Sequence, residues 1–253
     1  MPQAAIVTGM EHSGTTFLSD LLKSHPRING GFEGGMLLGN SPADFPNIQP
    51  FYDWMQKANN PTQWAVSAEN MRFVTAAPTW PEMYRRVMES SPLFSDTADI
   101  LLDKAPPYMP ILDQLMQKVP FPVIVIYKPV LYQYTSYKKR DFTLENFVWR
   151  YTHYFTGFFK AWKCCSSRML LVPHGELARK PEEVLRTVFR FLHIEQPAGK
   201  GDPASARLTA GPVKADYDPD KAEGDIRLLS AYEKEVLNKI SQDEILHKLA
   251  LRL

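Results

Sequence analysis

Short apolar runs alternate with amphipathic stretches over the first 194 residues of the chain. Five runs have the length of buried strands: Ala4–Thr8, about Arg27–Asn29, Asp99–Lys104, Phe121–Lys128 and Met169–Val172. Apolar residues recur at helical spacing within three of the intervening stretches: Phe17–Leu22, Ile111–Met116 and Val184–Leu192. This alternation predicts an α/β fold with three layers, in which helices flank a central, mostly parallel five-stranded sheet.

Two segments depart from this pattern within what we expect to be a single domain over residues 1–253. Residues 34–80 mix Pro, Asn and aromatic residues without a clear period, which indicates an insertion outside the core that could shape a binding pocket. Residues 195–225 are rich in Gly, Pro, Ala and Asp, and a loop of that length is usually functional or disordered. The aromatic stretch Phe142–Trp162 is expected to be a core helix, part of which could also line the pocket.

Composition limits the classes of molecule that we expect this protein to bind. The 253 residues include 29 Lys and Arg against 28 Asp and Glu, so overall charge does not favour nucleic acid or a membrane surface. The two cysteines are adjacent, and the histidines lack metal-ligand spacing, so we expect neither a disulfide framework nor a metal. A secretory signal and an apolar span are both absent from the sequence, and we therefore expect a cytoplasmic protein.

The segment that follows the first predicted strand has the outline of a phosphate-binding loop. Gly9 and Gly14 are separated by four residues and are followed by Thr15 and Thr16 at the start of a predicted helix. A P-loop for nucleoside triphosphates has a lysine where Thr15 stands, and that charge balances the β- and γ-phosphates. The sequence therefore favours a donor with fewer phosphates and no metal. The alternative is a plain strand–turn–helix connection with capping hydroxyls.

These motifs resemble those of the sulfotransferases, P-loop-like enzymes that use 3′-phosphoadenosine 5′-phosphosulfate (PAPS). The resemblance begins with Ser13-Gly14-Thr15-Thr16 and continues through His25-Pro26 and Gly31-Phe32-Glu33, in the style of the tyrosylprotein and Golgi carbohydrate branches. Lys128 at a strand end, with Ser136 eight residues later, is similar to the family's 3′-phosphate motif. The segment Asp103–Tyr108 is similar to a strand-end lysine motif of glycan sulfotransferases, in which the lysine faces the sulfuryl group.

The resemblance implies a role for each of these residues. Glu33 would be the base, and Lys104 and His12 would stabilise charge around the sulfuryl group. The donor would be held by Ser13, Gly14, Thr15, Thr16, Lys128 and Ser136, together with Lys214 from a C-terminal segment that also carries Lys200 and Arg207 and closes over the donor. The acceptor would carry a hydroxyl group, on a small molecule, a glycan or a tyrosine.

Two departures from the family pattern keep other functions open. His12 follows Glu11 where the family usually has a cation, and Lys128 replaces an arginine. Both changes are compatible with a nucleotide-binding module without turnover. A kinase or other phosphotransferase with an atypical P-loop is the alternative among enzymes, with Asp103 as its candidate magnesium ligand. For Glu33, the alternative is an exposed loop carboxylate.

Overall fold

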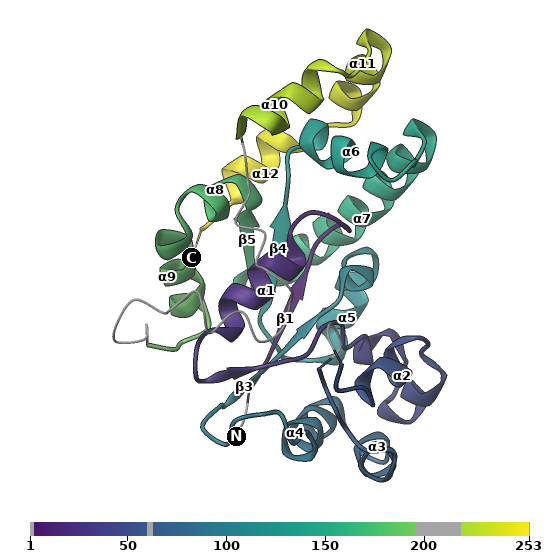
Figure 1. Cartoon of the computed structure of the whole chain (residues 1–253), viewed down its shortest axis with the longest axis vertical. Helices are drawn as coiled ribbons and strands as arrows, with labels where there is room; N and C mark the ends of the chain where they lie inside the picture. Colours follow the sequence, from purple (N-terminus) through teal and green to yellow (C-terminus); the bar gives the residue numbers. More distant parts are fainter. Residues whose placement is uncertain (1–2, 60–62, 196–218, 253) are drawn as a thin grey trace.

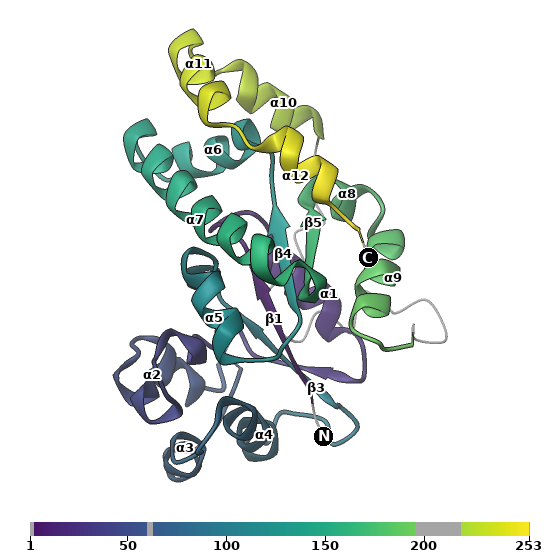
Figure 2. The ribbon, with the colours of Figure 1, turned by 180° about the vertical axis from the view of Figure 1, so that it is seen from behind.

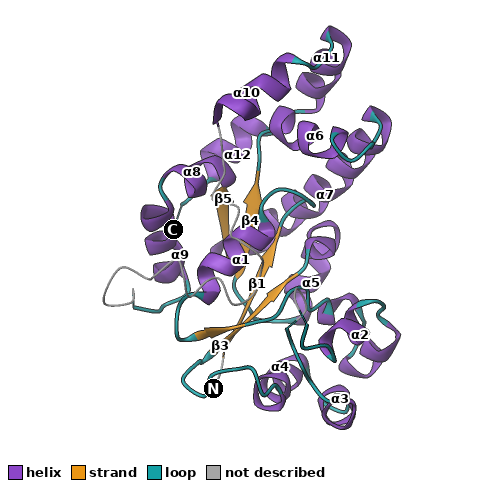
Figure 3. Cartoon of the chain, viewed as in Figure 1, coloured by secondary structure: helices purple, strands orange, loops and turns teal. Residues whose placement is uncertain are grey.

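A parallel five-stranded sheet forms the centre of the computed structural model, which describes residues 3–59, 63–195 and 219–252. The strands are β1 (Gln3–Thr8), β2 (Ile28–Asn29), β3 (Ile100–Lys104), β4 (Val123–Tyr127) and β5 (Met169–Pro173). Their order across the sheet is β2-β3-β1-β4-β5, and Figures 1 and 3 label the last four of these strands. The predicted α/β fold and its parallel sheet are confirmed.

Helices cover both faces of the sheet and bury two separate apolar clusters. On one face, α1 (Thr15–Lys23), α8 (His174–Arg179) and α9 (Pro181–Phe191) pack on side chains such as Val7 and Ile126. On the other face, η3 (Pro106–Ile111), α5 (Leu112–Lys118) and α7 (Leu144–Cys165) pack on side chains such as Ile6 and Val125. Figure 1 shows α1 in front of the sheet, and Figure 2 shows α5 and α7 on its opposite face. Adjacent strand residues serve different clusters because successive side chains point to opposite faces.

The strand order places the turning point of the sheet at β1. The chain passes from β1 through α1 to the β2 and β3 side, and it returns to β4 and β5 on the other side of β1. In open α/β sheets, ligands bind beyond the carboxyl ends of the strands at such a reversal. The Gly9–Gly14 loop leaves β1 at this end, next to Lys104 at the end of β3 and Lys128 just after β4.

The prediction that residues 34–80 lie outside the core is wrong. This segment forms η1 (Met36–Leu38), η2 (Pro42–Asn47), α2 (Phe51–Met55) and α3 (Ala68–Thr75), and α4 (Trp80–Ser90) follows. Met36, Phe45, Trp64 and Met71 are fully buried and belong to the cluster under α5 and α7. The apolar residues lack one period because they lie on short helical turns, and on the coil between them, that point in different directions.

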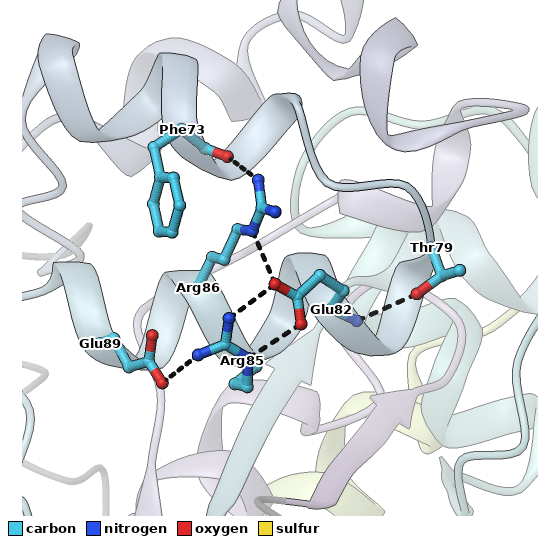
Figure 4. Close-up of polar contacts among 6 residues, drawn as sticks. All are labelled: Phe73, Thr79, Glu82, Arg85, Arg86 and Glu89. Atoms are coloured by element: carbon cyan, nitrogen blue, oxygen red, sulfur yellow. Dashed lines mark hydrogen bonds and ion pairs between the residues drawn. The ribbon is translucent and has the colours of Figure 1, made fainter.

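The helices α3 and α4 are joined by a group of charged side chains on their surface. Arg86 on α4 donates from Nη1 to the carbonyl oxygen of Phe73 on α3 at 2.6 Å, and its guanidinium group lies 4.3 Å from the centroid of the Phe73 ring. Glu82 accepts hydrogen bonds from both Arg85 and Arg86, as Figure 4 shows. Arg86 thus fixes the orientation of α3 against α4.

The remaining helices lie beyond the carboxyl ends of β4 and β5. They are α6 (Val130–Lys138), α10 (Pro219–Arg227), α11 (Ala231–Ile240) and α12 (Asp243–Leu249). Asp243 at the start of α12 accepts the backbone N–H of Val130 at 3.0 Å. Leu251, just after α12, donates its N–H to the carbonyl oxygen of Leu171 in β5 at 2.9 Å. The C-terminal helices are therefore held both to α6 and to the edge of the sheet.

Candidate active site

The loop between β1 and α1 packs so closely that its glycines leave no room for a side chain. A Cβ atom at Gly9 would lie 2.3 Å from the carbonyl oxygen of Ile126, and one at Gly14 would lie 2.4 Å from Cδ2 of His174. Gly14 also has a φ of +104°, which favours glycine. The first N–H groups of α1, at Thr15 and Thr16, follow directly. Such a helix N-terminus attracts an anion through its unpaired N–H groups and its dipole.

The side chain of Ser13 is turned into this loop. It is fully buried, and a Cβ atom at Gly9 would lie 2.7 Å from its Oγ atom. Its backbone N–H donates to the carbonyl oxygen of Met10 at 3.1 Å. Across the described residues, the Ser13 hydroxyl has no hydrogen-bond partner. Direct binding of a ligand by Ser13 stays a prediction, and it requires the hydroxyl to turn outward.

Lys104 connects the loop to Glu33. Its ammonium group donates to Oγ1 of Thr16 at 3.2 Å and to Oε1 of Glu33 at 3.0 Å. The side chain of Lys104 is 1% exposed and that of Glu33 is 17% exposed, and the Lys104 Nζ lies 3.8 Å from the centroid of the Phe32 ring. Burial lowers the pKa of Lys104, and the carboxylate of Glu33 opposes that shift. Three predicted site residues, from α1, β3 and the loop after β2, are thus in direct contact.

Lys128 and Ser136 meet on the other side of the loop. Lys128 Nζ donates to the carbonyl oxygen of His12 at 2.8 Å and lies 3.5 Å from Oγ of Ser136, on the second turn of α6. Burial lowers the pKa of Lys128 to about 8, and the nearby charges of Arg140 and Lys139 add to this shift. The spacing of eight residues therefore brings a cation and a hydroxyl to one place, next to the loop.

Arg140 is a cation that the sequence motifs did not indicate. Its Nη1 atom donates to the carbonyl oxygen of Ser136 at 2.5 Å. Burial lowers the pKa of His12, and the charge of Arg140 is the next cause of that shift. Positive charge near His12 therefore comes from neighbours such as Lys128 and Arg140, while His12 itself is a neutral imidazole at pH 7. The signal in the sequence was the basic run 138–140 that follows Ser136.

Glu11 anchors the loop to α6 and α7. Its carboxylate accepts hydrogen bonds from three side chains of these helices: Tyr137 at 2.6 Å, Arg150 at 3.0 Å and Tyr154. The next residue, His12, has a left-handed φ of 65° and packs edge-on against Tyr137, with ring centroids 5.2 Å apart. Glu11 therefore fixes the loop, a role that sequence reasoning missed.

Asp103, the residue before Lys104, is held inside the core. It is fully buried, and its Oδ2 atom accepts hydrogen bonds from the hydroxyls of Tyr84 at 2.5 Å and Tyr108 at 2.6 Å. A Cβ atom at Gly34 would lie 2.4 Å from Oδ1. Burial raises the pKa of Asp103 to about 6, although the tyrosine hydrogen bonds oppose the shift. Asp103 thus holds the segment after Glu33 against the end of β3.

His174, just after β5, is a second residue that sequence reasoning did not connect with the loop. Its ring contacts Gly14 and lies 6.2 Å from the ring of Phe17, centroid to centroid. Burial lowers the pKa of His174 to about 3, and the charge of Lys128 adds to the shift. His174 therefore supports the loop from behind as a neutral side chain.

The predicted donor residue Lys214 lies outside the described residues, as do Lys200 and Arg207. Over the described ranges, we find no group of three or more His, Cys, Asp or Glu side chains placed to hold a metal ion. None of the helices in the described part of the chain combines the length and the apolar character needed to cross a bilayer.

Comparison with known proteins identifies a family for most of the chain. A sequence profile described as "Sulfotransferase family" matches residues 4–198. A search of curated proteins finds no match.

Solved structures share the fold at low sequence identity. The sulfotransferase domain of the Synechococcus PCC 7002 olefin synthase has a TM-score of 0.62 at 17% identity, covering 94% of each chain. The sulfotransferase domain from the curacin biosynthetic pathway has a TM-score of 0.63 at 12% identity, covering 94% of this chain and 97% of that one. The sulfotransferase STF9 from Mycobacterium avium has a TM-score of 0.56 at 16% identity, covering 99% of this chain and 78% of that one. At these identities, the likeness concerns the fold.

Proposed function

The chain belongs to the sulfotransferase family, and from this premise we propose that it transfers the sulfuryl group of PAPS to a hydroxyl-bearing acceptor. The observation that carries the proposal is the position of Lys104. Its ammonium group contacts Thr16 at the N-terminus of α1, where a donor phosphate would bind, and Glu33, the candidate base. Lys104, a single buried cation, thus contacts both the place where the donor phosphate would bind and the carboxylate that would take the proton of the acceptor.

The described residues offer separate places for the two phosphates of the donor. The N–H groups of Gly14, Thr15 and Thr16 would hold the 5′-phosphate at the start of α1. Lys128 and Ser136, 3.5 Å apart, would hold the 3′-phosphate, with Arg140 adding positive charge. Lys214 would contribute from the C-terminal segment. No divalent metal is required, because the charge near the loop comes from side chains.

The transfer step then follows from where the charged groups lie. The acceptor oxygen attacks sulfur, the bond between sulfur and the bridging oxygen breaks, and its electron pair stays on the 5′-phosphate. Glu33 takes the proton of the acceptor hydroxyl, while Lys104 stabilises negative charge on the bridging and sulfuryl oxygens. His12, a neutral imidazole, would act as a hydrogen-bond donor. As in phosphoryl transfer, positioning and electrostatics supply most of the rate.

The acceptor is expected on the side of Glu33 that faces residues 34–80. Phe32 packs against Trp54, with ring centroids 5.9 Å apart, and both side chains are only half-buried. Such an aromatic wall would suit an acceptor with an apolar part next to its hydroxyl group. A small molecule, a glycan and a tyrosine side chain all meet that description.

The environment of Asp103 disfavours the kinase alternative. A P-loop kinase needs a strand-end acid that can reach Mg²⁺. Asp103 instead has both carboxylate oxygens enclosed in the core, where Tyr84 and Tyr108 donate to one of them. The carboxylate would have to leave two hydrogen bonds to coordinate a metal.

Replacing the base provides the test of the proposed chemistry. We expect Glu33→Gln to lower the turnover of sulfuryl transfer from PAPS by about 100-fold or more, because general base catalysis contributes factors of that order. Binding of adenosine 3′,5′-bisphosphate should stay unchanged, since Glu33 is not expected to contact the nucleotide. Glu69→Gln, on an exposed carboxylate of α3, is the matched control and should leave both quantities unchanged.

The outcomes distinguish the proposed function from its alternatives. If Glu33→Gln keeps most of its turnover, the base has been assigned wrongly. If the unaltered protein binds the bisphosphate but transfers sulfate to none of a panel of phenols, glycans, steroids and tyrosine peptides, the binding-module alternative is favoured instead.

A further inference from the structure

One face of α7 is turned away from the core and has the spacing of a helix–helix interface. Its residues recur at intervals of four and three: Glu145, Trp149, Thr152, Thr156, Phe159 and Lys163. The opposite face packs into the core through buried side chains such as Phe147, Tyr151 and Phe158. Trp149 is 65% exposed, although Trp side chains are highly buried on average. Intervals of four and three residues are those at which one helix contacts another along a shared seam.

The stripe lies in a continuous depression between α7 and α11. Two adjoining grooves, of about 400 and 670 Å³, share Thr152 and Thr156. Their other wall includes Tyr232, which is 66% exposed, and Ile240, both on α11. In Figure 2, α7 runs along the near face of the molecule, with α11 beside its upper end. A helix could lie in this depression against α7.

Charges of opposite sign stand at the two ends of the stripe. Glu145 is in the first turn of α7, and Lys160 and Lys163 are in its last two turns. All three side chains are exposed, and none of them forms an ion pair within the part of the chain that the structure describes. A partner helix that matches this stripe must therefore carry a cation opposite Glu145 and an anion opposite Lys163.

The helix α7 itself meets this requirement when it runs antiparallel to a copy of itself. Three pairs of stripe residues share one midpoint in the sequence, Tyr154: Glu145 with Lys163, Trp149 with Phe159, and Thr152 with Thr156. A two-fold axis at that midpoint would place each residue opposite its mate in the other copy. We propose that the α7 stripe binds the α7 stripe of a second copy of this chain, forming a two-fold symmetric dimer.

In this dimer Glu145 faces Lys163 of the second copy, and Trp149 faces its Phe159. The ion pairs at the rim fix the register and the antiparallel direction more than they add affinity. Trp149 and Phe159, together with Tyr232 from α11, supply the apolar area that leaves water. The Gly9–Gly14 loop and Glu33 do not belong to the stripe, so the proposed dimer does not depend on the proposed chemistry.

Sedimentation velocity on the full chain, from about 1 to 100 µM, tests the dimer. We expect a species of twice the 28.9 kDa chain mass that dissociates on dilution. Glu145→Lys and Lys163→Glu should each raise the dimer dissociation constant about tenfold or more, because each places like charges opposite one another twice. The double variant exchanges the charges and should restore dimerisation. Lys180→Glu, on an exposed lysine before α9, is the matched control and should have no effect.

Trp149→Ser provides a second readout that does not depend on charge. It should abolish the dimer without lowering the free energy of unfolding of the monomer, because the side chain is mostly exposed. A monomer at 100 µM would overturn the proposal. So would a dimer that tolerates each charge reversal, or a double variant that associates no better than the single ones.

Discussion

At the scale of single residues, the loop that contains Glu11 and His12 shows which features a local sequence motif can predict and which it cannot. The position of the loop follows from Gly9, Gly14 and the hydroxyls after them, which lie close together in the sequence. The partners of Glu11 do not follow from local sequence, because Tyr137 and Arg150 lie 126 and 139 residues further along the chain. The sequence therefore predicted a glycine-containing loop between β1 and α1, but could not show that its acidic residue anchors the loop on α6 and α7.

The same distinction applies to the other site residues. The contacts of Lys104 with Glu33 and of Lys128 with Ser136 could be anticipated, since each cation stands at the end of a recognisable strand. The enclosure of Asp103 could not, because it depends on Tyr84 in α4, 19 residues earlier in the chain, and no motif connects that helix with the end of β3.

Lys128 leads to a prediction about the pH dependence of donor binding. Its pKa is lowered to about 8, so the free protein loses this charge as the pH rises through that value. We therefore expect the affinity for adenosine 3′,5′-bisphosphate to fall above pH 8, and binding at pH 8.5 to take up a proton. Calorimetry in two buffers of different ionisation enthalpy, from pH 7 to 9.5, measures both effects.

Two substitutions of Lys128 check the assignment. Lys128→Met should weaken binding at pH 7 by about 10- to 100-fold, the usual range for a hydrogen bond to a charged group, and should remove the pH dependence above 8. Lys128→Arg should retain its charge up to pH 9.5, because an arginine stays protonated there. An unchanged pH profile in Lys128→Met would show that another group titrates.

At the scale of elements, the strands were predictable and the 34–80 segment was not. Apart from the two-residue β2, each strand is a short apolar run bounded by Gly, Pro or charged residues, which is a local signal. Residues 34–80 form 3₁₀ turns and short helices, whose buried residues face the core at irregular intervals. The contacts between α3 and α4 in Figure 4 are likewise tertiary, since Arg86 on α4 donates to the carbonyl oxygen of Phe73 on α3.

The packing of α7 on η3 predicts a change in stability opposite to the one that helix propensity alone would give. Alanine normally stabilises a helix by about 1 kcal/mol relative to glycine. At Gly157, however, a Cβ atom would lie 2.3 Å from the carbonyl oxygen of Met109 and 2.4 Å from that of Pro110. Because these are backbone atoms, we expect Gly157→Ala to lower the free energy of unfolding by about 2 kcal/mol, measured by urea denaturation.

Gly224 on α10 offers the matched control for the same substitution. A Cβ atom at Gly224 would meet no atom of the chain within 4 Å. Gly224→Ala should therefore raise the free energy of unfolding, by about 0.5–1 kcal/mol. If both substitutions stabilise the protein, α7 does not approach η3 as closely as described.

At the scale of the whole molecule, stability should depend on the protonation of Asp103. Burial raises its pKa from 3.8 to about 6, so the folded protein binds this proton more tightly than the unfolded chain. Its contribution to stability is then fully present below pH 3.8 and is lost as the pH rises to about 6. The contribution is on the order of 3 kcal/mol.

Comparison with Asp103→Asn isolates this contribution. The free energy of unfolding of the unaltered protein, minus that of Asp103→Asn, should fall between pH 4 and pH 6.5. Asp96→Asn, on an exposed carboxylate, should not show this change. Parallel pH profiles for the unaltered protein and Asp103→Asn would contradict the position of Asp103 in the core.

The central claim is that this protein is an enzyme whose donor is PAPS, which carries a 3′-phosphate and a 5′-phosphate. One calorimetric comparison tests this claim most directly. The full chain is titrated with adenosine 3′,5′-bisphosphate and, separately, with ATP and Mg²⁺. Because Thr15 stands where a triphosphate loop has lysine, and Lys128 lies beside Ser136 for a second phosphate, the account predicts saturable binding of the bisphosphate at least tenfold tighter than that of ATP. A preference for ATP with Mg²⁺ would contradict it.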